Sequence, residues 1–369
     1  MKIVFYSNQL CERGTETALI DYAFANKDVL RNESILAFPK DRIFDNNRYE
    51  MLKKDFEIIL FDDIKKFNQI LIERSVDLLY LIVDGKSKDI ADEIVGVKTF
   101  VHAVFDTTRK HGTYYCAIHN YLNKYFFTGY PVLPHIVKKL SDCKDDMHSE
   151  LNIPKDAIVY GSYAGKDRFN FRFVHDAIKE IAEKRKDIYF IFMNINNFLM
   201  DNYGCELENV IFLEGSTDPE VKAKFINTCD AMIHARDDGE TFGLSIAEFS
   251  SMNKPIITYK PGPRKMWRYF KDNQLKKKLS YSKAHLMILG KHAITYRNSK
   301  KLKKILLNFS KEKYAGKNMD FYTKRYSPEK VMKIFEKIIK SKKNKKLVVL
   351  SIFLDNIINF LTFLCDFFC

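Results

Sequence analysis

The sequence lacks the residue patterns that cross-link a chain or bind a metal ion. Its 369 residues include seven cysteines, an odd number, and no C-x-x-C pair occurs. No D-x-D triplet is present, and histidine and cysteine show no ligand spacing. These absences argue against a disulfide framework and a zinc site, and they favour a reducing compartment. No signal peptide precedes the first expected strand, so we expect a cytoplasmic protein.

Internal repeats and low-complexity linkers are also missing, which argues against a repeat protein. What the chain does have is a globular composition, with 46% hydrophobic and 29% charged residues. Its formal net charge of +14 comes from 61 lysines and arginines against 47 acidic residues. This excess favours an anionic partner, such as nucleic acid, an acidic membrane or a phosphorylated small molecule, without choosing among them.

Short apolar runs alternate with amphipathic stretches along most of the chain. The expected strands are 3–7, 34–38, 57–61, 78–83, 99–104 and 124–127, and then 157–160, 188–193, 210–213, 231–234 and 255–258. Helical patterns between them include 15–26, 64–74 and 244–252. Such alternation is typical of parallel sheets with helices on both faces. The pattern predicts an α/β chain of two doubly wound, Rossmann-like domains facing a cleft.

A break near residues 130–150 contains Pro131 and Pro134 and predicts the hinge between these domains. We expect a first domain at 1–135, a second at 145–320, a crossing helix and basic linker at 321–346, and an apolar tail at 347–369. Ser327-Pro328 is a good start signal for the crossing helix, which is expected to return to the first domain.

The tail 347–369 is strongly apolar, but nearly all of its polar residues fall on one helical stripe. This pattern suits a helix lying on a membrane or a partner better than one crossing lipid, because a charge at the bilayer centre costs about 3 kcal/mol. The lysine-rich run 342–346 favours anionic headgroups, whereas Asp355 and Asp366 on the stripe count against simple membrane binding. Peripheral membrane contact through 342–369 and packing within the chain or a dimer both stay open.

Residues 231–252 carry the most informative pattern, an apolar strand followed by a turn and a helix. Free backbone N–H groups and the helix dipole make such a turn a site for phosphate. Glu240 and Glu248 flank this turn, so the expected ligand carries hydroxyls as well as phosphates, as a sugar nucleotide does. Along a helix the two would lie about 12 Å apart, further than the roughly 5 to 9.5 Å of a glycosidase pair. We interpret them as two hydroxyl-binding carboxylates.

The segment from Glu240 to Glu248 resembles the E-G-F-G-L-x-x-x-E signature of the retaining GT-B glycosyltransferases, the glycosyltransferase group 1 family. Thr241 takes the place of the usual glycine, and residues 253–257 resemble the G-x-P-V-V strand that follows in that family. The resemblance implies that Glu248 holds the donor ribose and that Glu240 lies at the donor sugar. It also implies that the diphosphate meets the amides of Phe242, Gly243 and Leu244.

Two places in the first domain resemble the same family. Gly14, in the run Arg13-Gly14-Thr15-Glu16, matches its G-G-x-E loop, although a plain strand–helix turn is an open alternative. His102 lies near the end of the expected strand 99–104, where the family often has a histidine beside the reacting sugar. A packing role for His102 stays open, and His111 and His119 are its rivals.

The start of the second domain sits where the family has G-R-x-x-x-x-K, two cations that neutralise the leaving diphosphate. Here Ser162 stands in the arginine's place. Lys166 and Arg168 are expected to supply the charge from shifted positions. A solvent-exposed turn is the alternative interpretation of this run.

The resemblance implies a retaining, hexosyltransferase-like glycosyltransferase that moves a sugar from a nucleotide sugar to a glycan, lipid-linked or protein acceptor. We expect no metal cofactor, because the carboxylates that hold Mn²⁺ or Mg²⁺ in metal-dependent enzymes are missing. Two alternatives remain. The first is an inactive GT-B protein that binds nucleotide sugar or glycan, which Ser162 suggests. The second is a nucleic-acid-binding protein, but the lysines are scattered without an aromatic platform, so we expect no nucleic acid.

Overall fold

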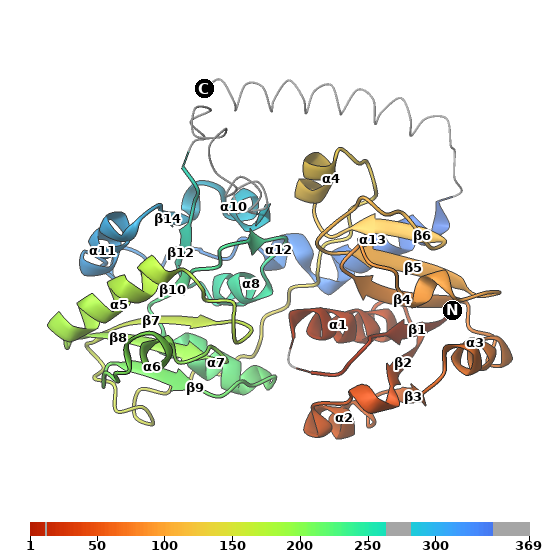
Figure 1. Cartoon of the computed structure of the whole chain (residues 1–369), viewed down its shortest axis with the longest axis horizontal. Helices are drawn as coiled ribbons and strands as arrows, with labels where there is room; N and C mark the ends of the chain where they lie inside the picture. Colours follow the sequence, from red (N-terminus) through yellow and green to blue (C-terminus); the bar gives the residue numbers. More distant parts are fainter. Residues whose placement is uncertain (12, 263–281, 342–369) are drawn as a thin grey trace. The chain divides into compact units, whose positions relative to one another are not determined.

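The computed structural model describes residues 1–11, 13–262 and 282–341, which divide into two compact units. The first unit contains Met1–Ile136 and the described residues from Tyr326 onward, and the second contains Val137–Arg325. Each unit has its own six-stranded sheet (Figure 1). The expected tail and the lysine run before it lie outside the described residues.

The first unit is built on a parallel sheet in the order β3-β2-β1-β4-β5-β6. Its strands are β1 (Lys2–Tyr6), β2 (Glu33–Pro39), β3 (Glu57–Phe61), β4 (Leu78–Val83), β5 (Lys98–Ala103) and β6 (Tyr114–Ala117). The chain moves outward from β1 to β3 and then returns to β4 on the other side of β1. In doubly wound sheets, ligands bind beyond the carboxyl ends of the strands at such a reversal.

Helices cover both faces of this sheet. They are α1 (Gly14–Asp28), α2 (Asn46–Leu52), α3 (Ile64–Glu73), α4 (Asn120–Phe126) and α13 (Pro328–Lys340), with short 3₁₀ turns η1 (Lys40–Arg42) and η2 (Ile90–Asp92). The helix α13 buries Val331, Met332 and Phe335 in the same core as strands β1, β4 and β5. The Phe335 ring lies 5.0 Å from that of Phe100. The last described helix therefore completes the core of the unit in which the chain begins.

The second unit repeats the doubly wound plan in the order β14-β12-β10-β7-β8-β9, again with parallel neighbours. Its strands are β7 (Ile158–Tyr163), β8 (Ile188–Met193), β9 (Val210–Leu213), β10 (Ala231–His234), β12 (Ile256–Tyr259) and β14 (Ile294–Tyr296). Its helices are α5 (Arg172–Lys184), α6 (Phe198–Tyr203), α7 (Pro219–Thr228), α8 (Leu244–Ser251), α10 (Ala284–Leu289), α11 (Ser299–Leu307) and α12 (Thr323–Tyr326), with the 3₁₀ turn η4 (Gly290–His292). The strand order reverses at β7, so the carboxyl ends of β7 and β10 form the switch point of this sheet.

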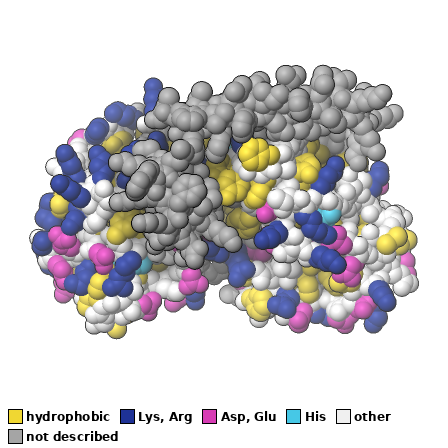
Figure 2. Space-filling view, turned by 45° about the horizontal axis from the view of Figure 1, so that its top comes forward, with side chains coloured by type: hydrophobic (Ala, Val, Ile, Leu, Met, Phe, Trp, Pro, Cys, Tyr) yellow, Lys and Arg dark blue, Asp and Glu magenta, His cyan; other side chains and the backbone are white. Residues whose placement is uncertain are grey.

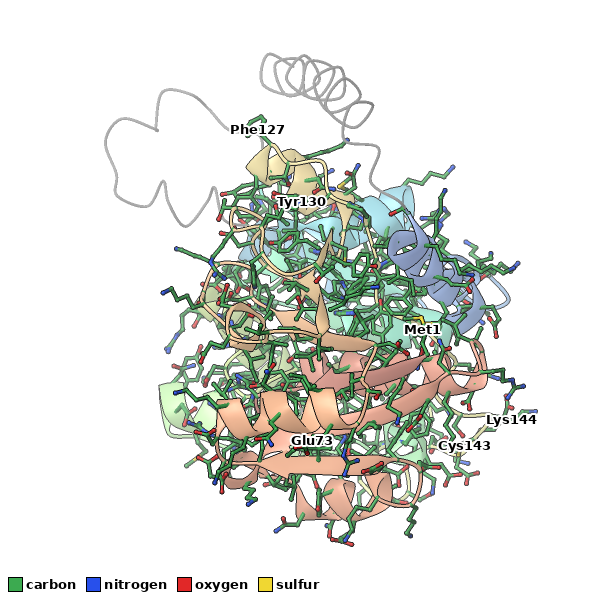
Figure 3. The ribbon with its side chains drawn as sticks, turned by 90° about the vertical axis from the view of Figure 1, so that its right-hand side faces the viewer. Met1, Glu73, Phe127, Tyr130, Cys143 and Lys144 are labelled. Carbon is green, nitrogen blue, oxygen red and sulfur yellow. The ribbon has the colours of Figure 1, made fainter. Side chains whose placement is uncertain are left out.

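One expected strand is wrong. Residues 124–127 belong to α4 and its end, and the sixth strand of the first sheet is β6, earlier in the chain. His119 starts α4, because its Nδ1 accepts a hydrogen bond from the Tyr121 backbone N–H at 3.0 Å. Phe127 ends the helix in the left-handed region with φ 54° and is 57% exposed, at the outer end of α4 in Figure 3. Among the described residues, no helix combines the length and apolarity that a membrane span requires.

Candidate functional site

Two glycines shape the loop between β10 and α8. Gly239 has φ +69°, and a Cβ there would lie 2.1 Å from the Ser282 carbonyl oxygen, so only glycine lets β11 (Gly239–Glu240) pair with β13 (Ser282–Lys283). Gly243, with φ +85°, is the residue that precedes α8. The chain thus turns sharply into α8, whose first backbone N–H groups have no partners within the helix. Free amides at the start of a helix are backbone geometry that suits an anion, and here they lie at the carboxyl edge of the second sheet.

Glu240 lies in this loop three residues before Gly243, within a network of charged and polar side chains. Its two carboxylate oxygens contact His234 Nε2 at 3.4 Å and Arg236 Nη1 at 3.1 Å. Burial alone raises the pKa of Glu240, but Arg236, His234 and His285 outweigh it and lower the pKa to about 2. Glu240 is therefore a fixed anion at neutral pH, suited to accept hydrogen bonds from a ligand but not to donate a proton.

Arg236 supplies most of the charge that holds Glu240 ionised. Its Nε and Nη2 atoms donate to the carboxylate of Asp238, while Nη1 donates to Glu240. Burial lowers the pKa of Arg236, but the two carboxylates raise it above its usual value. The expected motif did not include Arg236, although its spacing of four residues from Glu240 was a readable signal.

Glu248 lies one turn further along α8 and forms an ion pair with Lys222 of α7. The Glu248 Oε1 and Lys222 Nζ atoms are 2.6 Å apart, and each side chain is 12% exposed. Lys222 Nζ also lies 5.0 Å from the centroid of the Tyr163 ring, at the end of β7. The sequence pattern predicted neither Lys222 nor Tyr163 at this site.

The other residues of the turn differ in exposure. Phe242 is buried, 2% exposed, and its ring meets that of Tyr322 at 5.7 Å, while Thr241 and Leu244 are half-buried. The buried Phe242 ring therefore fixes the turn in the core, whereas Thr241 and Leu244 stay partly exposed beside the backbone amides of the turn.

The loop after β7 lies beside the β10–α8 loop. Asn170 joins them, because its side chain donates to Asp237 Oδ1 and accepts from the Asp237 backbone N–H, both at 2.9 Å. Arg168 Nη1 lies 3.4 Å from Asp238 Oδ2, in a pair about half exposed. Lys166 is exposed in the same loop. The structure thus brings Arg168 next to the expected donor loop, whereas the Lys166 carbonyl oxygen accepts a hydrogen bond from the Asn196 backbone N–H at 3.1 Å, in the loop after β8.

Ser162 departs from this arrangement. It is 2% exposed in β7 and pairs with Phe192 in β8. A buried hydroxyl cannot supply the charge of an arginine, which the glycosyltransferase signature that the sequence resembles has at this position.

In the first unit, Gly14 is the first residue of α1 and Arg13 precedes it as the N-cap. Glu16, two residues on, is only 3% exposed. It accepts hydrogen bonds from Ser7 Oγ at 3.3 Å and from Thr15 Oγ1 at 2.9 Å. These contacts tie the start of α1 to the end of β1, and the sequence pattern had not assigned them.

His102 lies inside the first unit and is 0% exposed. Its Nδ1 atom is 2.8 Å from the Tyr80 hydroxyl, and its ring lies 5.6 Å from that of His135. Burial, and then His135, lower the pKa of His102 well below its usual value, so the imidazole is neutral. These contacts are those of a core residue, and the expected contact with a sugar stays a proposal.

The rival histidines have structural partners as well. His111 Nε2 lies 2.6 Å from Asp89 Oδ2. His119 caps α4, and burial, followed by Lys124, lowers its pKa to about 4. Among the described residues, Asp89, Asp92 and His111 also form one cluster of potential metal ligands. Because Arg109 already pairs with Asp92 at 2.5 Å, this cluster is a hydrogen-bonded network that joins the β4–β5 and β5–β6 connections.

No family model matches the chain, and no curated protein matches it. Solved structures do. HepE from Anabaena, solved in complex with UDP and glucose, is 15% identical, covers 92% of this chain and 98% of its own, and has a TM-score of 0.65. A glycosyltransferase from Rickettsia africae is 12% identical, with 92% and 99% covered and a TM-score of 0.60.

WaaG, a glycosyltransferase involved in lipopolysaccharide biosynthesis, is 13% identical, with 92% and 100% covered and a TM-score of 0.54. A putative UDP-N-acetylglucosamine 2-epimerase from Listeria monocytogenes matches with the same TM-score of 0.54. At such low identity the likeness shows the fold, which proteins of different activities share. The chain has the GT-B fold, with two doubly wound parallel-sheet domains.

Proposed function

We propose that this protein is a metal-independent retaining glycosyltransferase that uses a nucleotide-sugar donor bound by its second unit. One observation carries the proposal. Gly243 turns the chain into α8 at the carboxyl edge of the sheet, and the carboxylates of Glu240 and Glu248 lie before and after this turn in the chain. A sugar nucleotide has phosphates between two hydroxyl-bearing groups, which is the order of partners that this loop offers.

In this proposal each residue of the loop has a separate role. Glu248 accepts hydrogen bonds from the ribose hydroxyls, and Glu240 accepts them from the donor sugar. The amides of Phe242, Gly243 and Leu244 bind the diphosphate, with charge from Lys166 and Arg168. Preorganised donors and charges aimed at a leaving group usually lower the barrier to reaction more than any other single effect.

The resemblance to retaining enzymes supports retention of configuration, with His102 and Gly14 as first-unit contacts to the donor. The neighbouring structures bound to UDP and UDP-glucose support a nucleotide sugar as the partner. The acceptor is a glycan, a lipid-linked molecule or a protein, and peripheral membrane contact through 342–369 belongs to the same proposal.

An inactive protein that binds nucleotide sugar is the second candidate, because Ser162 provides no cation.

Figure 2 bears on the nucleic-acid alternative, since lysines and arginines are mixed with acidic side chains over the face seen there. A continuous basic surface is the footprint of a nucleic-acid-binding protein. Our proposal of no nucleic-acid partner rests on the lysines being scattered along the sequence without an aromatic platform.

The test is a thermal-shift panel of UDP-, GDP- and ADP-sugars, followed by an assay of donor hydrolysis and transfer. At a ligand concentration of about 100 times Kd, binding stabilises the folded protein by about 2.7 kcal/mol. We expect one nucleotide series to raise the Tm of the wild type and Glu248→Ala to abolish the shift. Glu208→Ala, at an exposed position of the same unit, is the control and should keep it.

If no nucleotide raises the Tm of the wild type, the donor site is wrong. If a nucleotide binds but neither the wild type nor Ser162→Arg turns over the donor, the inactive binding protein is the better description.

A further inference from the structure

Lys222 and Glu248 form an unusually buried ion pair for two residues on separate helices. The two charged atoms lie 2.6 Å apart and each side chain is 12% exposed. On α7, the neighbours Ala223, Phe225 and Ile226 are core residues. A pair of this kind is a poor stabiliser, because removing both charges from water offsets much of their attraction. Its presence calls for a role other than stability.

The position of Lys222 indicates that role. Glu248 follows Leu244 by four residues, so both lie on one face of α8, about 6 Å apart along the axis. Lys222 Nζ thus contacts a side chain whose residue lies about one helical turn after the amides that begin α8. It also lies over the ring of Tyr163, the residue directly after Ser162. The ammonium is therefore close to the strand end where the family places its arginine.

Among the described residues, Arg236, Arg168 and Lys166 are less suited to an anionic ligand at this edge. Arg236 already donates through Nε, Nη1 and Nη2 to Asp238 and Glu240. Arg168 is paired with Asp238 and is 52% exposed, and Lys166 is exposed. A charge open to water is screened, whereas a charge shielded from it acts more strongly on a nearby phosphate. Lys222 is shielded and lies against the residue that meets the ribose.

We propose that Lys222 joins Lys166 and Arg168 in binding the donor diphosphate and supplies the water-shielded charge of the arginine that Ser162 does not provide. The proposal rests on the proposed function. In a nucleoside diphosphate the ribose is joined directly to the first phosphate, so a ligand on Glu248 brings that phosphate next to Lys222. The ribose hydroxyls then donate to Glu248, and the Lys222 ammonium turns from the carboxylate to a phosphate oxygen.

During transfer, the bond between the sugar's anomeric carbon and the diphosphate oxygen breaks, and its electron pair stays with the diphosphate. The acceptor hydroxyl oxygen forms the new bond to that carbon, and its proton passes to the departing diphosphate. Lys222 balances the negative charge that grows on the leaving group before this proton arrives. A lysine acts here as a mobile point charge and does not form the bidentate hydrogen bonds that arginine forms with phosphate.

The test compares binding of a nucleoside diphosphate with binding of its nucleoside by isothermal titration. The probes are UDP, GDP or ADP, whichever binds the wild type, and the matching uridine, guanosine or adenosine. We expect Lys222→Met to weaken diphosphate binding by about 10- to 100-fold, the usual range for a lost charge-assisted hydrogen bond. Nucleoside binding should change less than about threefold, and Lys222→Arg should restore most of the loss.

Two controls separate a phosphate contact from a structural effect. Lys224→Met alters a lysine two positions along α7, on the opposite side of the helix, and should bind like the wild type. In a Glu248→Gln background, Lys222→Met removes the second member of the pair, so no buried carboxylate is left without its cation. In this background, Lys222→Met should still weaken diphosphate binding more than nucleoside binding, because Lys222 contacts the phosphate rather than acting through Glu248.

The outcomes are distinguishable. If the wild type binds no nucleoside diphosphate, the proposed function itself fails. If the wild type binds one and Lys222→Met binds it equally well, Lys222 does not contact phosphate and the donor site stands. If Lys222→Met weakens nucleoside and diphosphate to the same extent, Lys222 only holds Glu248 in place, and this inference is overturned.

Discussion

Replacing Glu240 with glutamine should remove a pH-dependent part of the folding free energy. The folded protein lowers the pKa of Glu240 from 4.5 to about 2, a shift of about 2.5 units. At about 1.4 kcal/mol per unit, the ionised carboxylate contributes about 3 kcal/mol at neutral pH. Its side chain is only 16% exposed, so solvent screening takes little from this value.

The sign follows from the direction of the shift. Because the folded pKa lies below the unfolded one, the stabilisation is fully present above about pH 4.5. It is lost as the pH falls through 4.5 toward about 2, where Glu240 becomes protonated in the folded state as well. Glu240→Gln should therefore be about 3 kcal/mol less stable than the wild type near pH 7, and this deficit should shrink steadily below about pH 4.5.

The assay is urea unfolding of the full chain followed by far-ultraviolet circular dichroism, at about pH 7, 5, 4 and 3. Glu208→Gln, at an exposed position, is the matched control and should match the wild type at every pH. The reasoning is refuted if Glu240→Gln is as stable as the wild type near pH 7. It is also refuted if the deficit is the same near pH 3 as near pH 7.

Two further substitutions test the structure of the site. Gly239→Ala should break the β11–β13 pairing, because its Cβ would lie 2.1 Å from the Ser282 carbonyl oxygen. Gly204→Ala is the control, since Gly204 has a similar φ but nothing lies within 4 Å of the added Cβ. Equal Tm values for the two variants would contradict the expected clash. His102→Ala should lower the free energy of unfolding by roughly 2–5 kcal/mol, as expected for a truncated core side chain, measured by urea unfolding beside donor turnover. A fall in kcat with unchanged stability would instead support contact between His102 and the sugar.

Much of the fold could be predicted from apolar runs and their spacing. The run 188–193 is β8, as expected for a short apolar run bounded by polar residues, and the Ser327-Pro328 start signal marks the beginning of α13. The strand expected at 124–127 was wrong, since a short aromatic stretch fits a strand as well as a helix. Its helical state depends on the His119 cap and the buried Leu122, which the run itself does not contain.

The site could be predicted only where its residues are close in sequence. Glu240, Gly243 and Glu248 share one loop and helix, so their spacing carried the prediction. Lys222 comes from another helix, 26 residues away from Glu248, and meets it only when α7 and α8 pack. The burial of His102 could not be predicted for a different reason. A central parallel strand is covered on both faces, so its sequence shows no alternation of apolar and polar residues that would distinguish buried from exposed positions.

The most direct test of the donor site is hydrogen–deuterium exchange of the full chain, with and without the nucleoside diphosphate that raises the Tm most. We expect protection in peptides that cover 164–171, 219–228 and 235–252, and loss of that protection in Glu248→Ala. Protection confined to the first unit, or unchanged exchange at 235–252 under saturating nucleotide, would contradict the assignment of the donor site to the β10–α8 loop.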